Sequence, residues 1–104
     1  MTAMTLHILS ASPHAGPSFD LCRRALAPGD TLLLLCDGVY AALQDGACAQ
    51  QLDALAAATV AVYAIGDDCV ARGISGRLLP VVRATDYPGF VDLACRHPRS
   101  VSWF

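Results

Sequence analysis

Short apolar runs alternate with amphipathic stretches along this chain. Runs rich in Leu, Ile, Val and aromatic residues are typical of strands, and turn residues bound each of them. The run at 31–35 places four consecutive leucines after Thr31, which is typical of a strand buried on both faces of a parallel sheet. Pro80 cannot donate a ladder hydrogen bond and therefore suits the start of a strand. We predict strands at 5–9, 31–35, 60–65, 78–83 and 101–103.

Helical patterns fill the segments between these runs. Ser18 suits the N-cap of a first helix, and Asp37 suits the cap of a short second one. We predict helical segments at 19–26, 39–43, 48–57 and 86–96, and a helical turn that ends near Arg72. This repetition with short connections predicts a single α/β domain over residues 1–104, with a mainly parallel sheet of about five strands and helices on both faces. We interpret residues 1–3, ahead of Met4, as an N-terminal extension.

The composition favours burial against other subunits. Hydrophobic residues make up 55% of the chain and charged residues only 15%, where about 25% is usual. A domain of this size buries only about two-thirds of the surface that its unfolded chain exposes, so such an apolar composition favours assembly. We expect the isolated chain to self-associate at micromolar concentration.

Charge and hydropathy exclude several classes of protein. The net charge is -2, lysine is absent and the arginines are scattered, which argues against direct nucleic-acid binding. No apolar run reaches the ~18 to 20 residues of a membrane helix, and no secretory signal is evident at the N-terminus. Unpaired cysteines are typical of a reducing compartment, so we predict a cytoplasmic location.

The carboxyl ends of strands are where functional groups collect in open α/β sheets. These ends fall at 10–16, 36–40, 66–69 and 84–87. No Gly-x-Gly-x-x-Gly or P-loop motif follows any predicted strand, so no nucleotide cofactor is predicted. The five cysteines form no Cys-x-x-Cys pair and no metal-site spacing, so no metal is predicted either.

An ordered set of short segments carries a family resemblance. Its members are Leu6-His7-Ile8-Leu9 with Ser12-Pro13, Leu32 to Leu35 followed by Asp37-Gly38-Val39, Val62-Tyr63-Ala64, Asp68, Ala71-Arg72-Gly73, Asp86-Tyr87, Phe90-Val91 and Trp103. In this order and spacing the set resembles the DsrH/TusB family. The resemblance extends over nearly the whole chain from Met4 and implies a DsrEFH-like fold.

The resemblance also implies the small subunit of a hetero-oligomeric sulfur-relay complex. Such complexes (TusBCD or DsrEFH) are heterohexamers with two copies of each of three homologous subunits, so the implied partners are two larger relatives of this chain. The biosynthetic version passes persulfide sulfur between carrier proteins toward 2-thiouridine at the tRNA wobble position, and its sulfur-carrying cysteine belongs to a larger subunit. The oxidative version exchanges sulfur with a small carrier protein. The implied sulfurtransferase activity is that of the complex, not of this chain alone.

Cys22 is the candidate sulfur-carrying thiol, because the resemblance places the cysteine of DsrH-type members early in the first helix. A thiol in the first turns of a helix, followed by Arg23 and Arg24, is expected to have a lowered pKa and to attack an incoming persulfide. The alternative is that Cys22 lies between Phe19 and Leu26 on the buried side of the helix and only fills space.

The remaining cysteines and histidines have weaker claims to chemistry. Cys36, at the carboxyl end of a strand, departs from the family pattern, and we interpret it as structural or incidental. His14, in the loop after the first strand, is placed where it could orient a thiolate. The others are interpreted as packing or helix-end residues: Cys48, Cys69, Cys95, the core histidine His7, and His97.

Two further groups of residues receive structural interpretations. Asp68 and Arg72, four residues apart, are expected to form an ion pair on a helical turn. Tyr87, Phe90 and Trp103 are expected to pack in the core, with an interface role as the alternative.

These observations leave three hypotheses. The first is an assembly subunit of the sulfur relay that serves tRNA thiolation. The second is a DsrH-type subunit of the oxidative complex that carries sulfur on Cys22. The third is a small-ligand-binding α/β domain unrelated to sulfur. The sequence leaves open which pathway applies and which surface meets which partner.

Overall fold

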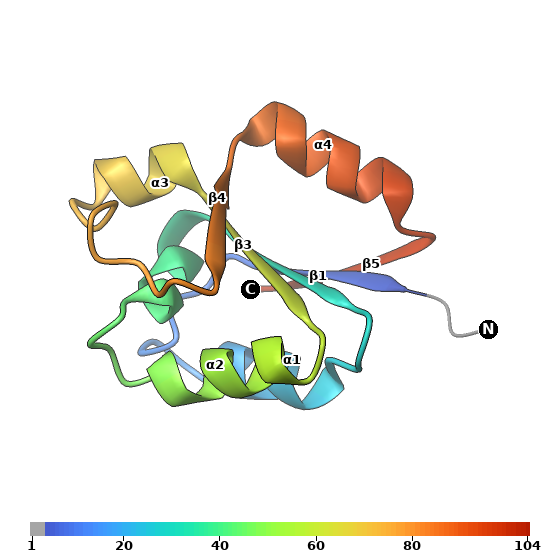
Figure 1. Ribbon diagram of the computed structural model, residues 1–104, viewed down its shortest axis with the longest axis horizontal. Helices are drawn as coiled ribbons and strands as arrows, with labels where there is room; N and C mark the ends of the chain where they lie inside the picture. Colours follow the sequence, from blue (N-terminus) through green and yellow to red (C-terminus); the bar gives the residue numbers. More distant parts are fainter. Residues whose placement is uncertain (1–3) are drawn as a thin grey trace.

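Five parallel strands form one sheet in the computed structural model, which describes residues 4–104 (Figure 1). Their order is β4-β3-β2-β1-β5, and every pair of neighbours is parallel. The strands are β1 (Thr5–Leu9), β2 (Thr31–Leu34), β3 (Ala61–Ile65), β4 (Val82–Thr85) and β5 (Arg99–Trp103). The predicted α/β class is therefore confirmed. The predicted N-terminal extension at residues 1–3 lies outside the described residues.

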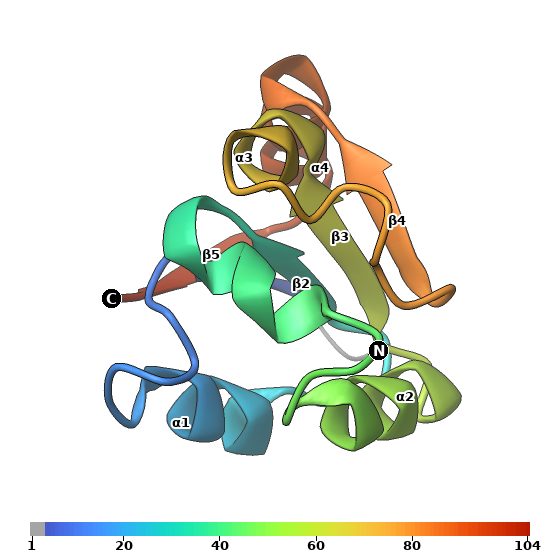
Figure 2. The same ribbon diagram turned by 90° about the vertical axis from the view of Figure 1, so that its left-hand side faces the viewer.

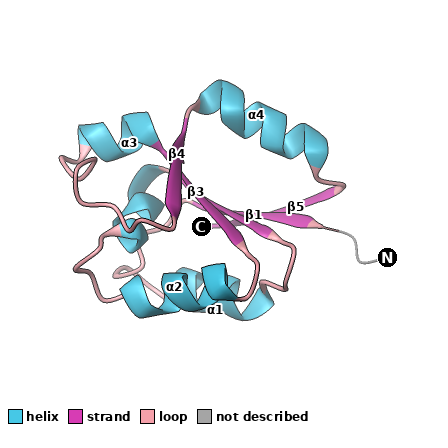
Figure 3. Ribbon diagram, in the orientation of Figure 1, coloured by secondary structure: helices cyan, strands magenta, loops and turns pink. Residues whose placement is uncertain are grey.

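Helices lie on both faces of the sheet, as the sequence predicted (Figures 1 and 2). One face is covered by α1 (Ser18–Ala25) and α2 (Ala49–Ala57). The other face carries α3 (Gly66–Ala71) and α4 (Tyr87–Arg96). A short 3-10 helix, η1 (Cys36–Ala42), follows β2, and Figure 3 shows these helices around the strands.

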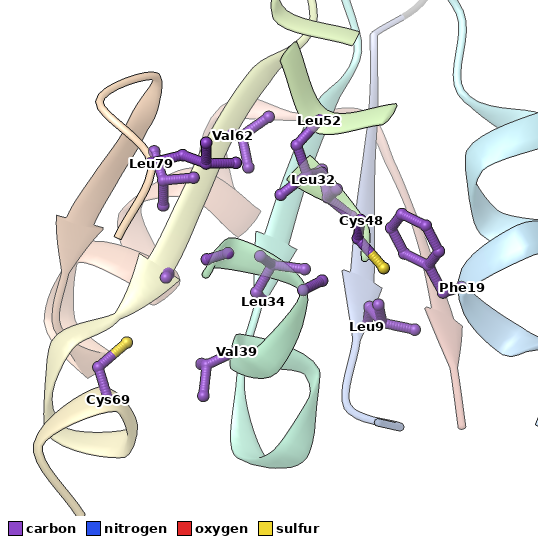
Figure 4. Close-up of a cluster of buried hydrophobic side chains, with 14 of the residues drawn as sticks. Leu9, Phe19, Leu32, Leu34, Val39, Cys48, Leu52, Val62, Cys69 and Leu79 are labelled. Atoms are coloured by element: carbon purple, nitrogen blue, oxygen red, sulfur yellow. The ribbon is translucent and has the colours of Figure 1, made fainter. Parts of the chain in front are cut away.

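The central strand β2 is buried on both faces. Its residues Leu32, Leu33 and Leu34 are each at most 1% exposed. Leu32 and Leu34 belong to the larger core cluster beneath α1 and α2 (Figure 4), whereas Leu33 packs with Leu6 and Leu93 on the opposite face. Successive side chains of a strand alternate between its faces, so an unbroken leucine run is what burial on both sides requires. The predicted double burial of this strand is confirmed.

The fourth strand lies further along the chain than the sequence pattern predicted. It begins at Val82, whereas the prediction placed it at 78–83 with Pro80 at its start. Pro80 instead lies in a turn, and Leu78 forms an isolated antiparallel bridge with Leu43. The segment before β4 is apolar because it packs on the core as a loop, and periodicity does not distinguish such a loop from a buried strand.

Two predicted helix caps are wrong. Ser18 is the first residue of α1 and does not cap it, because its hydroxyl donates across the fold to the carbonyl of Phe104. Asp37 lies inside η1 and caps nothing, because its carboxylate is held by another part of the chain. By contrast, Asp86 does cap α4, where its side chain accepts an N–H from the first turn at 2.7 Å.

Candidate functional site

The carboxyl ends of β2, β3 and β4 bring together polar and thiol side chains from distant parts of the sequence. We refer to Cys36, Asp37, Asp68, Arg72 and Tyr87 as the strand-end cluster. Cys36 and Asp37 begin η1, Asp68 lies in α3 with Arg72 at its C-cap, and Tyr87 begins α4. Parallel strands end at one edge of the sheet, which is why segments so far apart in sequence converge here.

Asp68 links two other members of the strand-end cluster. Its Oδ2 accepts the backbone N–H of Cys36 at 2.7 Å and the hydroxyl of Tyr87 at 3.2 Å. Cys36 needs such support because its φ of 49° lies in the left-handed region, which is unfavourable for residues with a Cβ. Tyr87 is 45% exposed, so its predicted packing in the core is wrong. Partial burial raises the pKa of Tyr87 and the Asp68 charge raises it further, so the phenol stays protonated and donates to the carboxylate.

Arg72 joins the other half of the strand-end cluster. Its Nε and Nη2 donate to Asp37 Oδ1 at 3.0 and 2.9 Å, and its Nη1 donates to the backbone carbonyl of Asp68 at 3.2 Å. The hydrogen bond with Asp37 raises the pKa of Arg72 above its usual value. The predicted ion pair between the Asp68 and Arg72 side chains is therefore wrong, because the guanidinium reaches across to η1 instead.

The strand-end cluster fixes η1, α3 and α4 relative to one another and leaves one thiol at the surface. The Cys36 side chain is exposed, while its backbone N–H is held by Asp68. Sequence reasoning missed the contacts of Asp37 and Asp68. The rule that strand ends converge was a usable signal, since it had placed these residues with Tyr87 at one edge of the sheet.

Cys22 lies on the buried face of α1, in the larger core cluster and outside the strand-end cluster, and is 1% exposed. Burial raises the pKa of its thiol to about 12, so the expected lowering of this pKa is wrong. The neighbouring arginines do not offset the burial, because Arg23 and Arg24 both pair with the Asp20 carboxylate. The geometry matches the alternative interpretation of Cys22 as a space-filling residue, and a sulfur-carrying role for it stays a prediction.

The other cysteines divide into buried and exposed thiols, and all five in the chain are free. Cys48 and Cys69 are buried, which confirms their interpretation as small hydrophobes. Burial also raises the pKa of both thiols. Cys95 is exposed on α4, so its interpretation as a packing residue is wrong. Of the described cysteines, Cys36 and Cys95 are thus the thiols that solvent reaches.

The histidines are placed largely as the sequence suggested. His7 is 4% exposed; its Nε2 lies 3.3 Å from Asp30 Oδ2 and its Nδ1 accepts the indole N–H of Trp103 at 3.2 Å. Its interpretation as a satisfied core histidine is confirmed. His97, at the C-cap of α4, contacts the Thr31 hydroxyl at 2.9 Å. His14 is exposed in the loop after β1, and no hydrogen bond within residues 4–104 joins its ring to a cysteine.

Sites for other ligands are limited in the part of the chain that the structure describes. Among residues 4–104, no three potential ligand side chains come together to hold a metal ion. A cavity of about 320 Å³ lies between α1 and α2, lined by Arg23, Gln50, Gln51, Ala54 and Leu55 and by no member of the strand-end cluster. None of the helices within residues 4–104 has the length and apolar character that a membrane crossing requires.

Comparisons with known proteins identify relatives over most of the chain. Residues 11–100 match the family model described as DsrH like protein. Protein TusB of Escherichia coli strain K12 is 41% identical over 98 residues, which cover 94% of this chain and 99% of the relative. Protein TusB of Shigella flexneri matches to the same extent.

Solved structures share the fold. The YchN protein of E. coli superposes with a TM-score of 0.82 at 20% identity, over 99% of this chain and 100% of that one. Tm0979 of Thermotoga maritima gives a TM-score of 0.62 at 28% identity, over 88% and 91% of the two chains. The fold matches those structures, and the sequence matches place the chain in a family: it belongs to the DsrH/TusB family.

Proposed function

We propose that this chain is a subunit of a cytoplasmic sulfur-relay complex whose contribution is assembly rather than direct sulfur transfer. Family membership supports the sulfur-relay role, since the resemblance of this chain to the DsrH/TusB family implies it. The partners in this proposal are two larger homologous subunits, with two copies of each chain in a heterohexamer. In this proposal the complex serves the pathway toward 2-thiouridine at the tRNA wobble position. The 41% identity to TusB, which covers 99% of that protein, favours this pathway rather than the oxidative one.

The burial of Cys22 is the observation that supports an assembly role in place of direct sulfur transfer. Thiol–disulfide and persulfide exchange require a thiolate, and a thiol with a pKa of about 12 is almost entirely protonated near pH 7. The donor persulfide that this thiolate would attack must also reach the Cys22 sulfur, which is buried in the core. Sulfur therefore passes through a thiol of a neighbouring subunit in this proposal.

A variant of Cys22 in the co-purified complex tests the proposal. Cys22→Ala is preferred to Cys22→Ser, because alanine adds no polar group at this buried position, whereas serine would bury a hydroxyl. We expect the variant to assemble with both larger subunits and to sustain persulfide transfer and 2-thiouridine formation at wild-type rates. Mass spectrometry of each subunit after loading with a persulfide donor shows where the sulfur resides, with Cys95→Ala as the matched control.

The alternative, a DsrH-type carrier acting through Cys22, gives a different result in the same experiment. A carrier would assemble as Cys22→Ala but stall sulfur transfer, and wild-type Cys22 would become persulfidated. Failure to co-purify with either larger subunit would contradict the assembly role itself.

A further inference from the structure

The edge strand β5 is unusually exposed for a strand of a parallel sheet. Four of its five residues are exposed and only Trp103 is half-buried, whereas β1 beside it is buried at four of five positions. Strands of parallel sheets are normally covered on both faces, and open edges normally carry protective features such as proline, lysine or a bulge. Within Arg99–Trp103 there is no proline, no lysine and no acidic residue, and Arg99 at the start of the strand is its one charged residue.

The backbone orientation of β5 determines which of its groups are free. Ser10 N–H donates to the Trp103 carbonyl at 3.1 Å, so the N–H and C=O of Trp103 point toward β1. These groups alternate in direction along a strand, so Val101 also bonds to β1, while Ser100 and Ser102 point their N–H and C=O away from the sheet.

The side chains of β5 alternate in the same way. The Trp103 indole contacts His7, so Trp103 lies on the sheet face that α1 and α2 cover, together with Arg99 and Val101. Val101 is 39% exposed on that face. Ser100 and Ser102 lie on the α4 face.

We propose that β5 pairs with β5 of a second copy of this chain, antiparallel and centred on Val101. A two-fold axis through this residue pairs all five positions of the strand. Ser100 of each copy then faces Ser102 of the other as a hydrogen-bonded pair, which uses the N–H and C=O groups that β1 leaves free. The result is a continuous sheet through both subunits, closed by two-fold symmetry.

The side chains that this register brings together are complementary. Arg99 faces Trp103 of the second copy, where a guanidinium can stack on the indole face, and Val101 faces its own symmetry mate. A centre shifted to Ser100 or Ser102 would leave part of the strand unpaired and would separate Arg99 from the indole. Chemical complementarity therefore favours a second copy of this chain as the occupant of the edge.

Exposed apolar residues flank the same edge. Leu21 on α1 is 48% exposed and Phe104 is 87% exposed. The Ser18 hydroxyl donates to the Phe104 carbonyl, so the start of α1 lies beside the end of β5. The strand pairing would bring this flank of each subunit toward the other and reduce the apolar surface left in water. The inference is independent of the proposed function, because it concerns two copies of this chain alone.

Sedimentation of the full chain from about 1 to about 100 µM tests whether the pairing exists. We expect a monomer–dimer equilibrium for the wild type. Ser102→Pro removes an N–H that only the second copy would use, so it should weaken dimerisation at least tenfold while the circular dichroism and melting of the monomer stay unchanged. Ser102→Thr, which keeps the N–H, is the matched control and should dimerise like the wild type.

Cysteine cross-linking tests the register. In a background with Cys36→Ser and Cys95→Ser, Val101→Cys places two thiols opposite each other at a non-hydrogen-bonded pair, and mild oxidation should give a covalent dimer. Ser100→Cys and Ser102→Cys in that background should stay largely uncross-linked, since neither residue faces its own symmetry mate.

Four results would overturn the proposal. These are a monomer at all concentrations, equal cross-linking at positions 101 and 102, and open-ended oligomers that indicate pairing of β5 with the opposite edge β4. The fourth is cross-linking of Val101→Cys to a larger relay subunit in the co-purified complex, which would give the edge a different occupant. None of the four contradicts membership of a sulfur-relay complex.

Discussion

The raised pKa of the Cys22 thiol makes the stability of the fold depend on pH. Burial raises its pKa from 9.0 to about 12. Between these two values the unfolded chain releases the thiol proton and the folded chain keeps it, so the unfolded state binds fewer protons. The stabilisation that this group contributes is thus fully present below pH 9 and is lost as the pH rises through that window.

We expect Cys22→Ala to flatten the fall in unfolding free energy at alkaline pH. The wild type should lose at most about 1.4 kcal/mol per pH unit more than the variant above pH 9. Urea unfolding at several pH values measures the difference. The exposed Cys95→Ala is the control and should follow the wild-type slope. Identical slopes for wild type and Cys22→Ala would contradict the burial of this thiol in solution.

Asp68 is the residue on which the strand-end cluster depends most. Its carboxylate holds the backbone of Cys36, which has an unfavourable φ, and accepts the hydroxyl of Tyr87. We expect Asp68→Ala to lower the unfolding free energy by about 1 to 3 kcal/mol, because both donors lose a charged acceptor. Asp67→Ala, at the exposed preceding position of α3, should change it by less than about 0.5 kcal/mol. Chemical denaturation of both variants makes the comparison.

At the scale of elements, the packing of η1 on β1 depends on a glycine. A Cβ on Gly38 would lie 2.2 Å from the Leu9 carbonyl oxygen and 2.9 Å from its carbon. These are backbone atoms of a buried strand, so η1 would have to move away from the sheet and open the core beneath it.

We expect Gly38→Ala to lower the unfolding free energy by about 2 kcal/mol or more, as overpacking against a rigid element does. Gly76→Ala is the matched control, since a Cβ there would meet nothing within 4 Å. That change should be neutral or slightly stabilising, because alanine restricts the unfolded chain. Thermal melts of the two variants should therefore shift apart, and equal melts would show that η1 does not approach β1 so closely.

The elements that sequence reasoning located well are those whose burial pattern is local. The leucine run of β2 and the apolar run of β3 needed only their own residues to be recognised. β4 was misplaced because the loop before it packs on the core, and that burial depends on η1 and α2 rather than on the loop sequence. β5 was found only at its end, since Arg99 and Ser100 carry no apolar signal and are strand only because β1 pairs with them.

The candidate site, too, could be predicted from the sequence only in part. The rule that functional groups collect at the carboxyl ends of parallel strands located the cluster correctly, because this rule depends on topology alone. The partners within the strand-end cluster could not be predicted, since Asp37 and Arg72 are joined across 35 positions of sequence. The sequence placed Cys22 on the correct helix but predicted a lowered thiol pKa where burial raises it, because a position along a helix does not say how deeply a thiol is buried.

At the scale of the whole molecule, the strand order predicts a gradient of local stability across the sheet. β2 lies in the middle with helices on both faces, and β5 lies at an edge with most of its surface in water. Amides opened only by global unfolding exchange slowest, and those exposed in local fluctuations exchange fastest. We expect Leu33 of β2 to exchange at the global rate, Val101 of β5 to exchange faster, and Ser102 to exchange fastest of the three.

Native-state hydrogen exchange at low micromolar concentration measures this order, where the chain is mainly monomeric. Raising the concentration should then slow Ser102 selectively, because its N–H enters the ladder between two copies, while Leu33 responds only to the added stability of the dimer. Leu33 exchanging as fast as Val101 would contradict the layered gradient. Uniform slowing of Ser102 and of exposed loop amides would indicate non-specific association, and the edge strand would then have no special part in how this chain assembles.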